Sequence, residues 1–224
     1  MVKGKEFLGP LLGKERVKNY AEALLGRGKV KKVYRPLVER ALLELSREGF
    51  CSKPRRILDL GTGPGFLAIE LAKRFPQAQV VGVDLSPDML DYARSQRGSK
   101  SLTNLDFKLG DAQDIPFEDG FFDLVVSHGM IKCVPDISRA LGEVYRVLAG
   151  GGLALILDVR KEALRELEEE REKLDPEEFS RKRRAMEKSL TMYEVRLILE
   201  SLPFKEMVEL RKRGYHFEIA IYKS

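Results

Sequence analysis

ILDLGTGPG, at residues 57–65, is the stretch of this 224-residue chain that decides its fold. The residues Ile57–Leu60 are mostly apolar and predict a buried strand, and the three glycines at alternate positions predict a tight turn that a ligand can approach closely. The segment Phe66–Phe75 then carries apolar side chains at helical spacing. A strand, a bare loop and a helix would place backbone N–H groups at the carboxyl end of the strand, where open parallel sheets bind ligands.

The rest of the chain alternates between strand and helix patterns. Ile137–Leu148 has apolar residues at helical spacing, and Ser86 followed by Pro87 predicts the N-cap and first residue of another helix. The further predicted strands are Gln79–Leu85, Leu105–Gly110, Phe122–Ser127, Leu153–Asp158, Phe204–Leu210 and Tyr215–Tyr222. The alternation predicts an α/β fold with a doubly wound, mostly parallel sheet, and the last two strands predict a closing antiparallel C-terminal hairpin.

A glycine loop followed by a distant acid is compatible with more than one kind of site. Asp84 ends the second predicted strand about twenty residues beyond the loop, where a carboxylate captures ribose hydroxyls. A dinucleotide-binding dehydrogenase would require G-x-G-x-x-G, but Phe66 occupies the sixth position, and Asp59 would face the phosphates unfavourably. These departures argue against a dinucleotide site. From the motif alone, a glycine-rich loop that occurs by chance remains the alternative.

The segment from about Pro54 to Asp158 resembles the class I S-adenosylmethionine (SAM)-dependent methyltransferases, particularly the branch of quinone-biosynthesis and related small-molecule enzymes. Five motifs carry the resemblance: LDLGTGPG at 58–65, GVDLSPDM at 82–89, GDA at 110–112, residues 117–127, and EVYRVLAGGG at 143–152. The resemblance implies a Rossmann-like, seven-stranded sheet. It also implies SAM as the cofactor and transfer of its methyl group to a small molecule by in-line displacement, with S-adenosylhomocysteine as the product.

The resemblance assigns roles to the loop and to two acids. The loop residues would lie against the methionine and ribose parts of SAM; they are Gly61, Thr62, Gly63 and Gly65. Asp59 would accept a hydrogen bond from the cofactor's ammonium group, directly or through water. Asp84 would hold both ribose hydroxyls. The alternative is that both acids are ordinary carboxylates at strand ends.

Four further residues are implied near the adenine ring, and one near the cofactor's carboxylate. Asp111 would accept from the adenine amino group with Ala112 beside it, while Leu85 and Met89 would flank the ring. Met89 could equally be core packing, because a helical methionine is usually buried for that reason. Tyr20 resembles the tyrosine that relatives place near the carboxylate, although it could be a surface or packing tyrosine.

Ser127 and His128 follow the fourth predicted strand, where the resemblance places methyl delivery. A general base is needed only if the acceptor must lose a proton, and His128 is the candidate because its pKa starts near neutrality. The alternative is that His128 only shapes the pocket. No metal site is expected, since Cys51 and Cys133 are the only cysteines and lie far apart.

The chain is expected to form one structural domain with two accessory parts. Residues 1–50 are predicted as a helical lid segment, and residues 51–224 as the SAM-binding domain. Within the latter, residues 161–190 form a helical insert that either covers the substrate or is simply a pair of exposed helices. Asp175 and Thr191 are the predicted N-caps of two helices in this region.

Composition limits the cellular setting and the partners. No apolar run approaches the length of a membrane span and the N-terminus is too charged for a secretory signal, so a cytoplasmic location is expected. Charged residues make up 33% of the chain, which suggests heat adaptation through ion pairs. Residues 1–50 hold 12 Lys and Arg against 6 Asp and Glu. This surplus is either a solvated surface or a patch for RNA or an anionic substrate.

Two other functions therefore remain as alternatives to a small-molecule enzyme. They are an RNA methyltransferase and a SAM-binding regulatory protein without turnover. The sequence shows no recognisable RNA-binding module, and it does not reveal the oligomeric state.

Overall fold

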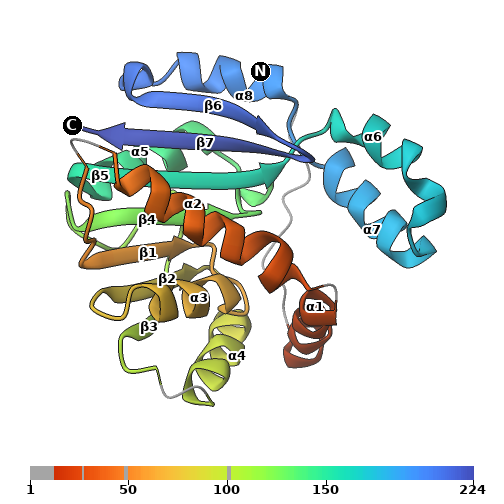
Figure 1. Cartoon of the computed structure of the whole chain (residues 1–224), viewed down its shortest axis with the longest axis horizontal. Helices are drawn as coiled ribbons and strands as arrows, with labels where there is room; N and C mark the ends of the chain where they lie inside the picture. The colour runs from red at the N-terminus through yellow and green to blue at the C-terminus, as the bar shows by residue number, and fades with distance from the viewer. Residues whose placement is uncertain (1–12, 27, 48–49, 100–101) are drawn as a thin grey trace.

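A seven-stranded sheet lies between two layers of helices in the computed structural model, which describes residues 13–26, 28–47, 50–99 and 102–224 (Figure 1). The strand order is β3-β2-β1-β4-β5-β7-β6. Only β7 runs antiparallel to its neighbours. The strands are β1 (Arg56–Leu60), β2 (Gln79–Asp84), β3 (Leu105–Leu109), β4 (Phe122–His128), β5 (Leu148–Val159), β6 (Val208–Arg213) and β7 (His216–Lys223). The predicted mostly parallel sheet with an antiparallel C-terminal hairpin is confirmed.

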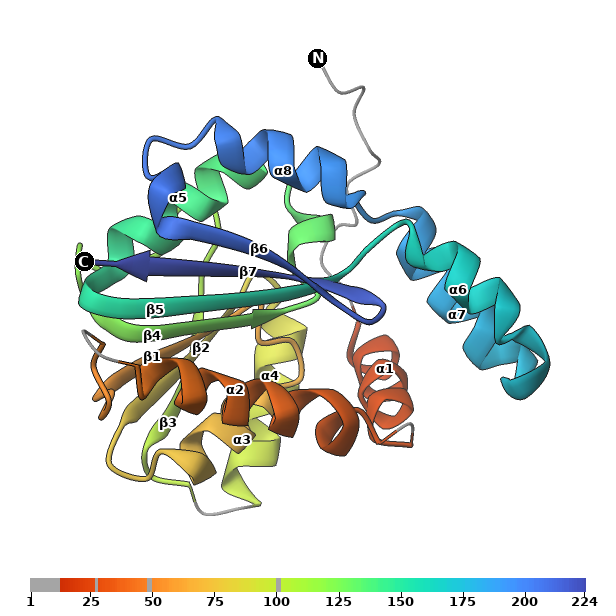
Figure 2. The same cartoon turned by 45° about the horizontal axis from the view of Figure 1, so that its top comes forward.

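The helices cover both faces of this sheet (Figure 2). Ile57 of β1 packs in the core with α2 and α3, while its neighbour Leu58 packs in the core with α5 and α8. Because both faces are covered, the central strands are continuous apolar runs rather than alternating ones. The helices are α1 (Lys14–Gly26), α2 (Arg35–Leu45), α3 (Phe66–Arg74), α4 (Pro87–Gly98), α5 (Ile137–Val147), α6 (Ala163–Glu169), α7 (Pro176–Glu187) and α8 (Met192–Glu200). Four short turns complete the order: a π-helical turn, η1 (Val30–Tyr34), and the 3-10 turns η2 (Ile131–Cys133), η3 (Arg171–Lys173) and η4 (Lys205–Met207).

The predicted helix starts are confirmed by their capping bonds. Ser86 accepts a hydrogen bond from the Met89 N–H at 3.3 Å and opens α4. Asp175 caps α7 in the same way, and Thr191 and Glu194 form the reciprocal capping box of α8. These side chains satisfy N–H groups that have no partner within the first turn of a helix, so the sequence signal is local.

The predicted bounds of the last strands are partly wrong. β6 begins at Val208 rather than Phe204, because the Phe204 ring stacks on Tyr145 of α5 at 4.1 Å and the chain first makes the turn η4. β6 also continues to Arg213, beyond the predicted end of this strand at Leu210. The turn is confined to Gly214 and Tyr215 between the two strands, and Gly214 has a φ of +54°.

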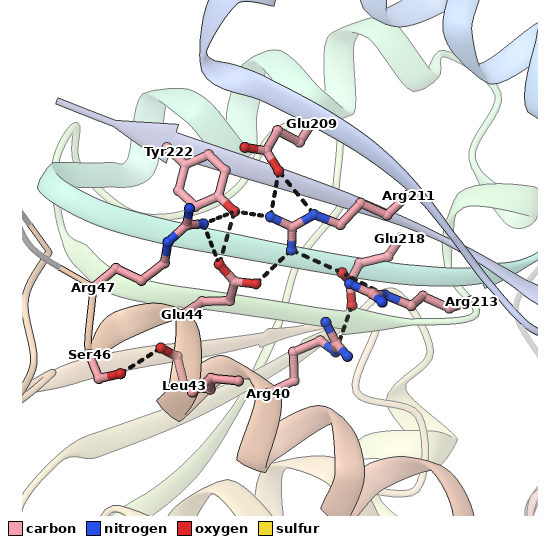
Figure 3. Close-up of polar contacts among 10 residues, drawn as sticks. All are labelled: Arg40, Leu43, Glu44, Ser46, Arg47, Glu209, Arg211, Arg213, Glu218 and Tyr222. Carbon is pink, nitrogen blue, oxygen red and sulfur yellow. Dashed lines mark hydrogen bonds and ion pairs between the residues drawn. The ribbon is translucent and has the colours of Figure 1, made fainter.

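An α2–hairpin charge network, made of Arg40, Glu44, Arg211, Arg213 and Glu218, joins α2 to the C-terminal strands (Figure 3). The Glu218 carboxylate is only 1% exposed and lies 3.3 to 3.4 Å from the nearest guanidinium nitrogens of three arginines. Glu44 pairs with Arg211 at 2.6 Å across the same surface. The network therefore holds a helix near the N-terminus against strands that are more than 160 residues later in the sequence.

Replacing Glu218 with glutamine is expected to lower the free energy of unfolding by about 2 kcal/mol. Removing one partner of a buried ion pair typically costs more, but the three arginines reach solvent and part of their charge stays hydrated. Chemical denaturation of both proteins measures the difference. Glu209→Gln is the matched control, because that carboxylate also pairs with Arg211 but is half exposed, and its loss should cost well under 1 kcal/mol. Equal losses for the two variants would contradict this account of the network.

One segment extends from the central sheet, and another packs against it. The insert of α6 and α7 projects beyond the carboxyl ends of the strands (Figures 1 and 2) and has its own small apolar cluster of Ala163, Leu167, Phe179 and Met186. At the N-terminal end, Leu37, Ala41 and Leu45 of α2 are buried against the sheet. The first twelve residues of the predicted lid lie outside the described residues. None of the helices in the described ranges has the length and apolar character that crossing a bilayer requires.

Candidate functional site

A cavity of about 430 Å³ opens at the carboxyl ends of β1, β2 and β4. Most of the residues singled out from the sequence line it. Those residues are Tyr20, Gly61, Gly63, Asp84, Leu85, Met89, Asp111, Ala112 and His128. The wall is completed by residues that the sequence did not single out, notably Gln113, Lys132 and Cys133. No residue of the segment 161–190 lines the cavity.

The glycine loop forms one wall of the cavity, and its own N–H groups are already bonded. Gly61 and Thr62 donate to the Val83 carbonyl at 2.8 and 2.9 Å, Gly63 donates to Asp84 Oδ2 at 2.7 Å, and Gly65 donates to the Thr62 carbonyl at 3.0 Å. Pro64 has no N–H. The expectation that this loop offers free N–H groups to a ligand is therefore wrong for residues 61–65.

Close packing explains why glycine occupies two of these positions. Gly61 has a φ of +73°, and a Cβ there would lie 2.8 Å from the Cβ of Met130. Gly65, the N-cap of α3, has a φ of +82°, and a Cβ there would lie 2.8 Å from the Cβ of Ala93. The left-handed conformation and the lack of space both exclude a larger side chain. The loop thus brings its backbone, rather than side chains, to the cavity.

Asp84 lies at the end of β2, between the loop and the cavity. One carboxylate oxygen accepts from the Gly63 N–H at 2.7 Å and the other accepts from the Ser86 N–H at 2.9 Å. Burial raises the pKa of this carboxyl, while the backbone N–H donors oppose the rise. Each carboxylate oxygen can accept more than one hydrogen bond, so Asp84 can still accept from a ligand in the cavity.

Asp59 lies behind the loop rather than in the cavity wall. Its side chain is 1% exposed and accepts from the Thr62 hydroxyl at 2.7 Å. Burial raises the pKa of Asp59 to about 7. Thr62 is itself buried. The polar atoms of Asp59 and Thr62 are turned toward each other rather than toward the cavity.

The opposite wall combines apolar and polar groups. Leu85 is 44% exposed and Met89 only 5%, and both line the cavity. Met89 therefore belongs to the core and to the wall at once. Asp111 Oδ1 accepts from the backbone N–H of Gln113 at 2.9 Å, in a turn where Asp111 also bridges to Asp114. This turn replaces a helix in the short connection between β3 and β4.

The end of β4 separates two residues that were predicted together. Ser127 is fully buried and donates to the Leu60 carbonyl at 2.7 Å, so it ties β4 to β1 and does not line the cavity. Its predicted place beside a ligand stays a prediction. The next residue, His128, does line the cavity, because successive residues of a strand point to opposite faces.

His128 lies between two other rings. Tyr34 meets it edge to face with ring centres 5.4 Å apart, and the ring of His216 lies 5.7 Å away. Its Nε2 atom is buried without a hydrogen-bond partner among the described residues. Burial, helped by Lys29, His216 and Lys132, holds the pKa of His128 well below its usual range. The imidazole is therefore neutral at physiological pH, and a weaker base than a free histidine.

Neither histidine is expected to titrate between pH 6 and pH 8. The pKa of His216 is lowered to about 4, again mainly by burial. Because both folded-state values are depressed, the protein loses stability as the pH falls below the ordinary histidine value of about 6.5. Carbon-bound imidazole proton shifts in NMR spectra should stay constant from pH 8 to pH 6, with His216→Gln assigning the two signals. An inflection of the His128 signal near pH 6.5 would refute the burial argument.

The chain matches known proteins along its central part. A model of the methyltransferase-domain family matches residues 52–208. The chain belongs to this family. It is 41% identical over 111 residues to the demethylmenaquinone methyltransferase of Deinococcus radiodurans, which covers 50% of this chain and 46% of that protein. The corresponding Thermus thermophilus enzyme is 46% identical over 105 residues, with 47% of each chain covered. The chain spans about half the length of these curated relatives in the matched region.

One solved structure resembles this methyltransferase-domain protein along nearly its whole length. A Methanococcus maripaludis protein assigned to the SAM-dependent methyltransferases superposes with a TM-score of 0.71 and 26% identity. The superposition covers 99% of this chain and 98% of the other. The likeness therefore includes α1, the α6–α7 insert and the C-terminal hairpin as well as the motif-bearing strands.

Proposed function

We propose that this protein binds SAM in the cavity and transfers its methyl group to a small-molecule acceptor. The observation that carries the proposal is the bonding of the glycine loop: the N–H groups of residues 61–65 are bonded within the protein, and a carboxylate faces the cavity beside them. A pyrophosphate would need free N–H donors from this loop, and residues 61–65 offer none. SAM has a ribose, an adenine and an amino-acid group but no phosphate, so it fits this wall.

The residues present fit the parts of this cofactor. Asp84 would accept hydrogen bonds from the ribose hydroxyls, since both of its oxygens have lone pairs to spare. Asp111 would accept from the adenine amino group, and Leu85 and Met89 would contact the ring. Tyr20, on α1, would close the cavity near the cofactor's carboxylate, which gives the N-terminal helix its proposed role as a lid. Asp59 would act by holding Thr62 and thereby the shape of the loop.

The main role of the protein in this reaction would be to position the reactants. Bound SAM supplies an electrophilic methyl group, and the cavity holds the acceptor in line with it and excludes water. His128 lines the part of the cavity where the methyl acceptor would bind, and its buried Nε2 atom has no hydrogen-bond partner in the part of the chain that the structure describes. A neutral imidazole there can accept a hydrogen bond from the methyl acceptor, or take up the proton that the methyl acceptor releases. The lowered pKa of His128 limits it as a base.

Incubation with methyl-labelled SAM tests the proposed reaction. The purified protein is given a small-molecule extract in one sample and total RNA in another, and labelled products are identified by mass spectrometry. We expect label in a small molecule. Label in RNA only, at a rate that falls steeply with salt, would favour an RNA methyltransferase. Binding of S-adenosylhomocysteine without any labelled product would favour a regulatory protein.

A cytoplasmic location and heat stability stay predictions from composition. A melting temperature in the ordinary mesophilic range would refute the prediction of heat stability.

A further inference from the structure

Lys132 is a charged side chain at the acceptor end of the cavity that the sequence did not single out. It lies in the 3-10 turn η2 directly after β4 and is 17% exposed. Its ammonium group donates to the Gly129 carbonyl at 2.5 Å and to Asp158 Oδ1 at 2.9 Å. An ammonium group has three N–H bonds, and the third has no acceptor among the described residues.

The ion pair presents its positive end to the cavity. Asp158, at the end of β5, is fully buried and does not line the cavity, whereas Lys132 does. Asp158 also accepts from the backbone N–H groups of Lys132 and Val159 at 3.2 and 2.8 Å, which fixes its carboxylate behind the lysine. The Asp158 charge raises the pKa of Lys132 against the opposing effect of burial, so the ammonium stays charged. The carboxylate thus holds the cation in place from the side away from the ligand.

The other groups around Lys132 add no negative charge. His128 and His216 are neutral at physiological pH, because their pKa values are lowered by burial and by nearby cations, including Lys29. Burial raises the pKa of the Cys133 thiol, which is therefore mostly uncharged. Tyr20 also acts on Lys132, and Asp84 and Lys188 act on the Cys133 thiol. Lys132 is the cation that lines the cavity directly beside Cys133.

We propose that Lys132 binds an anionic oxygen of the methyl acceptor, so that the acceptor is a carboxylate, an enolate or a phenolate. Asp158 is the positioning residue for that contact. This inference rests on the proposed methyl transfer at the same site. An N–H bond of a charged ammonium to an anionic oxygen is short and about twice as strong as a neutral hydrogen bond, and it favours the ionised form of the acceptor.

The charge balance of the reaction fits such an acceptor. The electron pair of the acceptor anion forms the new bond to the methyl carbon, and the pair of the broken carbon–sulfur bond stays on sulfur. The anion and the sulfonium cation are both neutralised, and no proton has to be removed at that step. This accounts for a site in which the histidine is a weak base while a fixed cation lies beside it.

Cys133 offers a test that does not require the acceptor to be known. The protein is alkylated with iodoacetate or with its neutral analogue iodoacetamide, with and without saturating S-adenosylhomocysteine, and the rate at each cysteine is followed by peptide mass spectrometry. The same thiolate attacks both reagents and displaces iodide, so the ratio of the two rates does not depend on how much thiolate is present. Cys51 lies outside the cavity and serves, with free N-acetylcysteine, as the reference.

The iodoacetate-to-iodoacetamide ratio at Cys133 is expected to exceed that at Cys51 by about fivefold, because a nearby cation attracts the anionic reagent. Lys132→Gln should abolish the excess, since its amide can still donate to Asp158 but carries no charge. Lys132→Arg should retain it. Lys205→Gln, a change at an exposed lysine of η4, should leave it unaltered.

Three results would overturn the proposal: equal ratios at the two cysteines, an excess that survives Lys132→Gln, or a Cys133 that reacts with neither reagent. Calorimetry with S-adenosylhomocysteine separates this failure from a failure of the proposed function. Lys205→Gln should bind S-adenosylhomocysteine as tightly as the unmodified protein does. If the unmodified protein fails to bind it, the methyltransferase proposal falls, whatever the alkylation ratio is.

Discussion

Asp84→Ala is expected to weaken the binding of S-adenosylhomocysteine by at least about 100-fold. The carboxylate would accept two hydrogen bonds from the ribose, and bonds to a charged group contribute about 1.5–3 kcal/mol each, with about 1.4 kcal/mol for each factor of ten. The change also removes the acceptor of the Gly63 N–H at 2.7 Å, which loosens the loop. Titration calorimetry of the variant and the unmodified protein measures the difference.

Two further variants make this result specific. Asp84→Asn keeps the size of the side chain and one of its acceptor oxygens, so an intermediate loss is expected. Asp91→Ala removes an exposed acid of α4 that pairs with Arg94 at 3.2 Å, and it should bind like the unmodified protein. Unchanged affinity in Asp84→Ala, with its thermal unfolding intact, would remove Asp84 from the ligand site.

Asp59→Asn is expected to make the unliganded protein more stable above pH 7. The pKa of this carboxyl is raised from 3.8 to about 7 by burial, so the folded protein holds a proton that the unfolded chain releases between these values. The contribution of Asp59 to stability is therefore fully present below pH 3.8 and is lost as the pH rises through 7, by about 4 kcal/mol in total. Asparagine cannot ionise and avoids that loss.

The informative quantity is the difference in unfolding free energy between Asp59→Asn and the unmodified protein, measured by denaturation from pH 4 to pH 8. Taking the difference removes the opposite contribution of the histidines, which lose stability at low pH. The difference should move in favour of the variant as the pH rises. Asp106→Asn, at a carboxylate that is 76% exposed, should show no such trend. A flat difference for Asp59 as well would mean that its carboxylate is ionised throughout.

The parts of the fold that the sequence predicts are those with local causes. The strand–loop–helix unit and the caps at Ser86 and Thr191 follow from side chains within a few residues of each other. Asp84 and Asp111 were placed correctly at the cavity because the carboxyl ends of parallel strands meet at one edge of the sheet. The sequence does not predict that a turn replaces the start of the strand at Phe204, because this depends on the ring of Tyr145, 59 residues earlier in α5.

The acceptor end of the site was much less predictable. The neighbours of His128 come from η1 and from the start of β7, and only the folded chain brings Tyr34 and His216 to it. Lys132 gave no signal, because its role depends on Asp158 in the adjacent strand β5. The bonding of the Gly61, Thr62 and Gly63 N–H groups was also hidden, since their acceptors are in β2. The roles of Asp59, Ser127 and Tyr20 toward a ligand, and the lid and insert as covers, stay predictions.

Calorimetric titration of the unmodified protein with S-adenosylhomocysteine and, separately, with NAD⁺ tests the central claim most directly. The claim is that a loop with no free N–H donors between residues 61 and 65, beside the carboxylate of Asp84, is built for a cofactor without phosphate. We predict binding of S-adenosylhomocysteine at one site per chain and no heat with NAD⁺. Binding of NAD⁺, or no binding of S-adenosylhomocysteine, would contradict it.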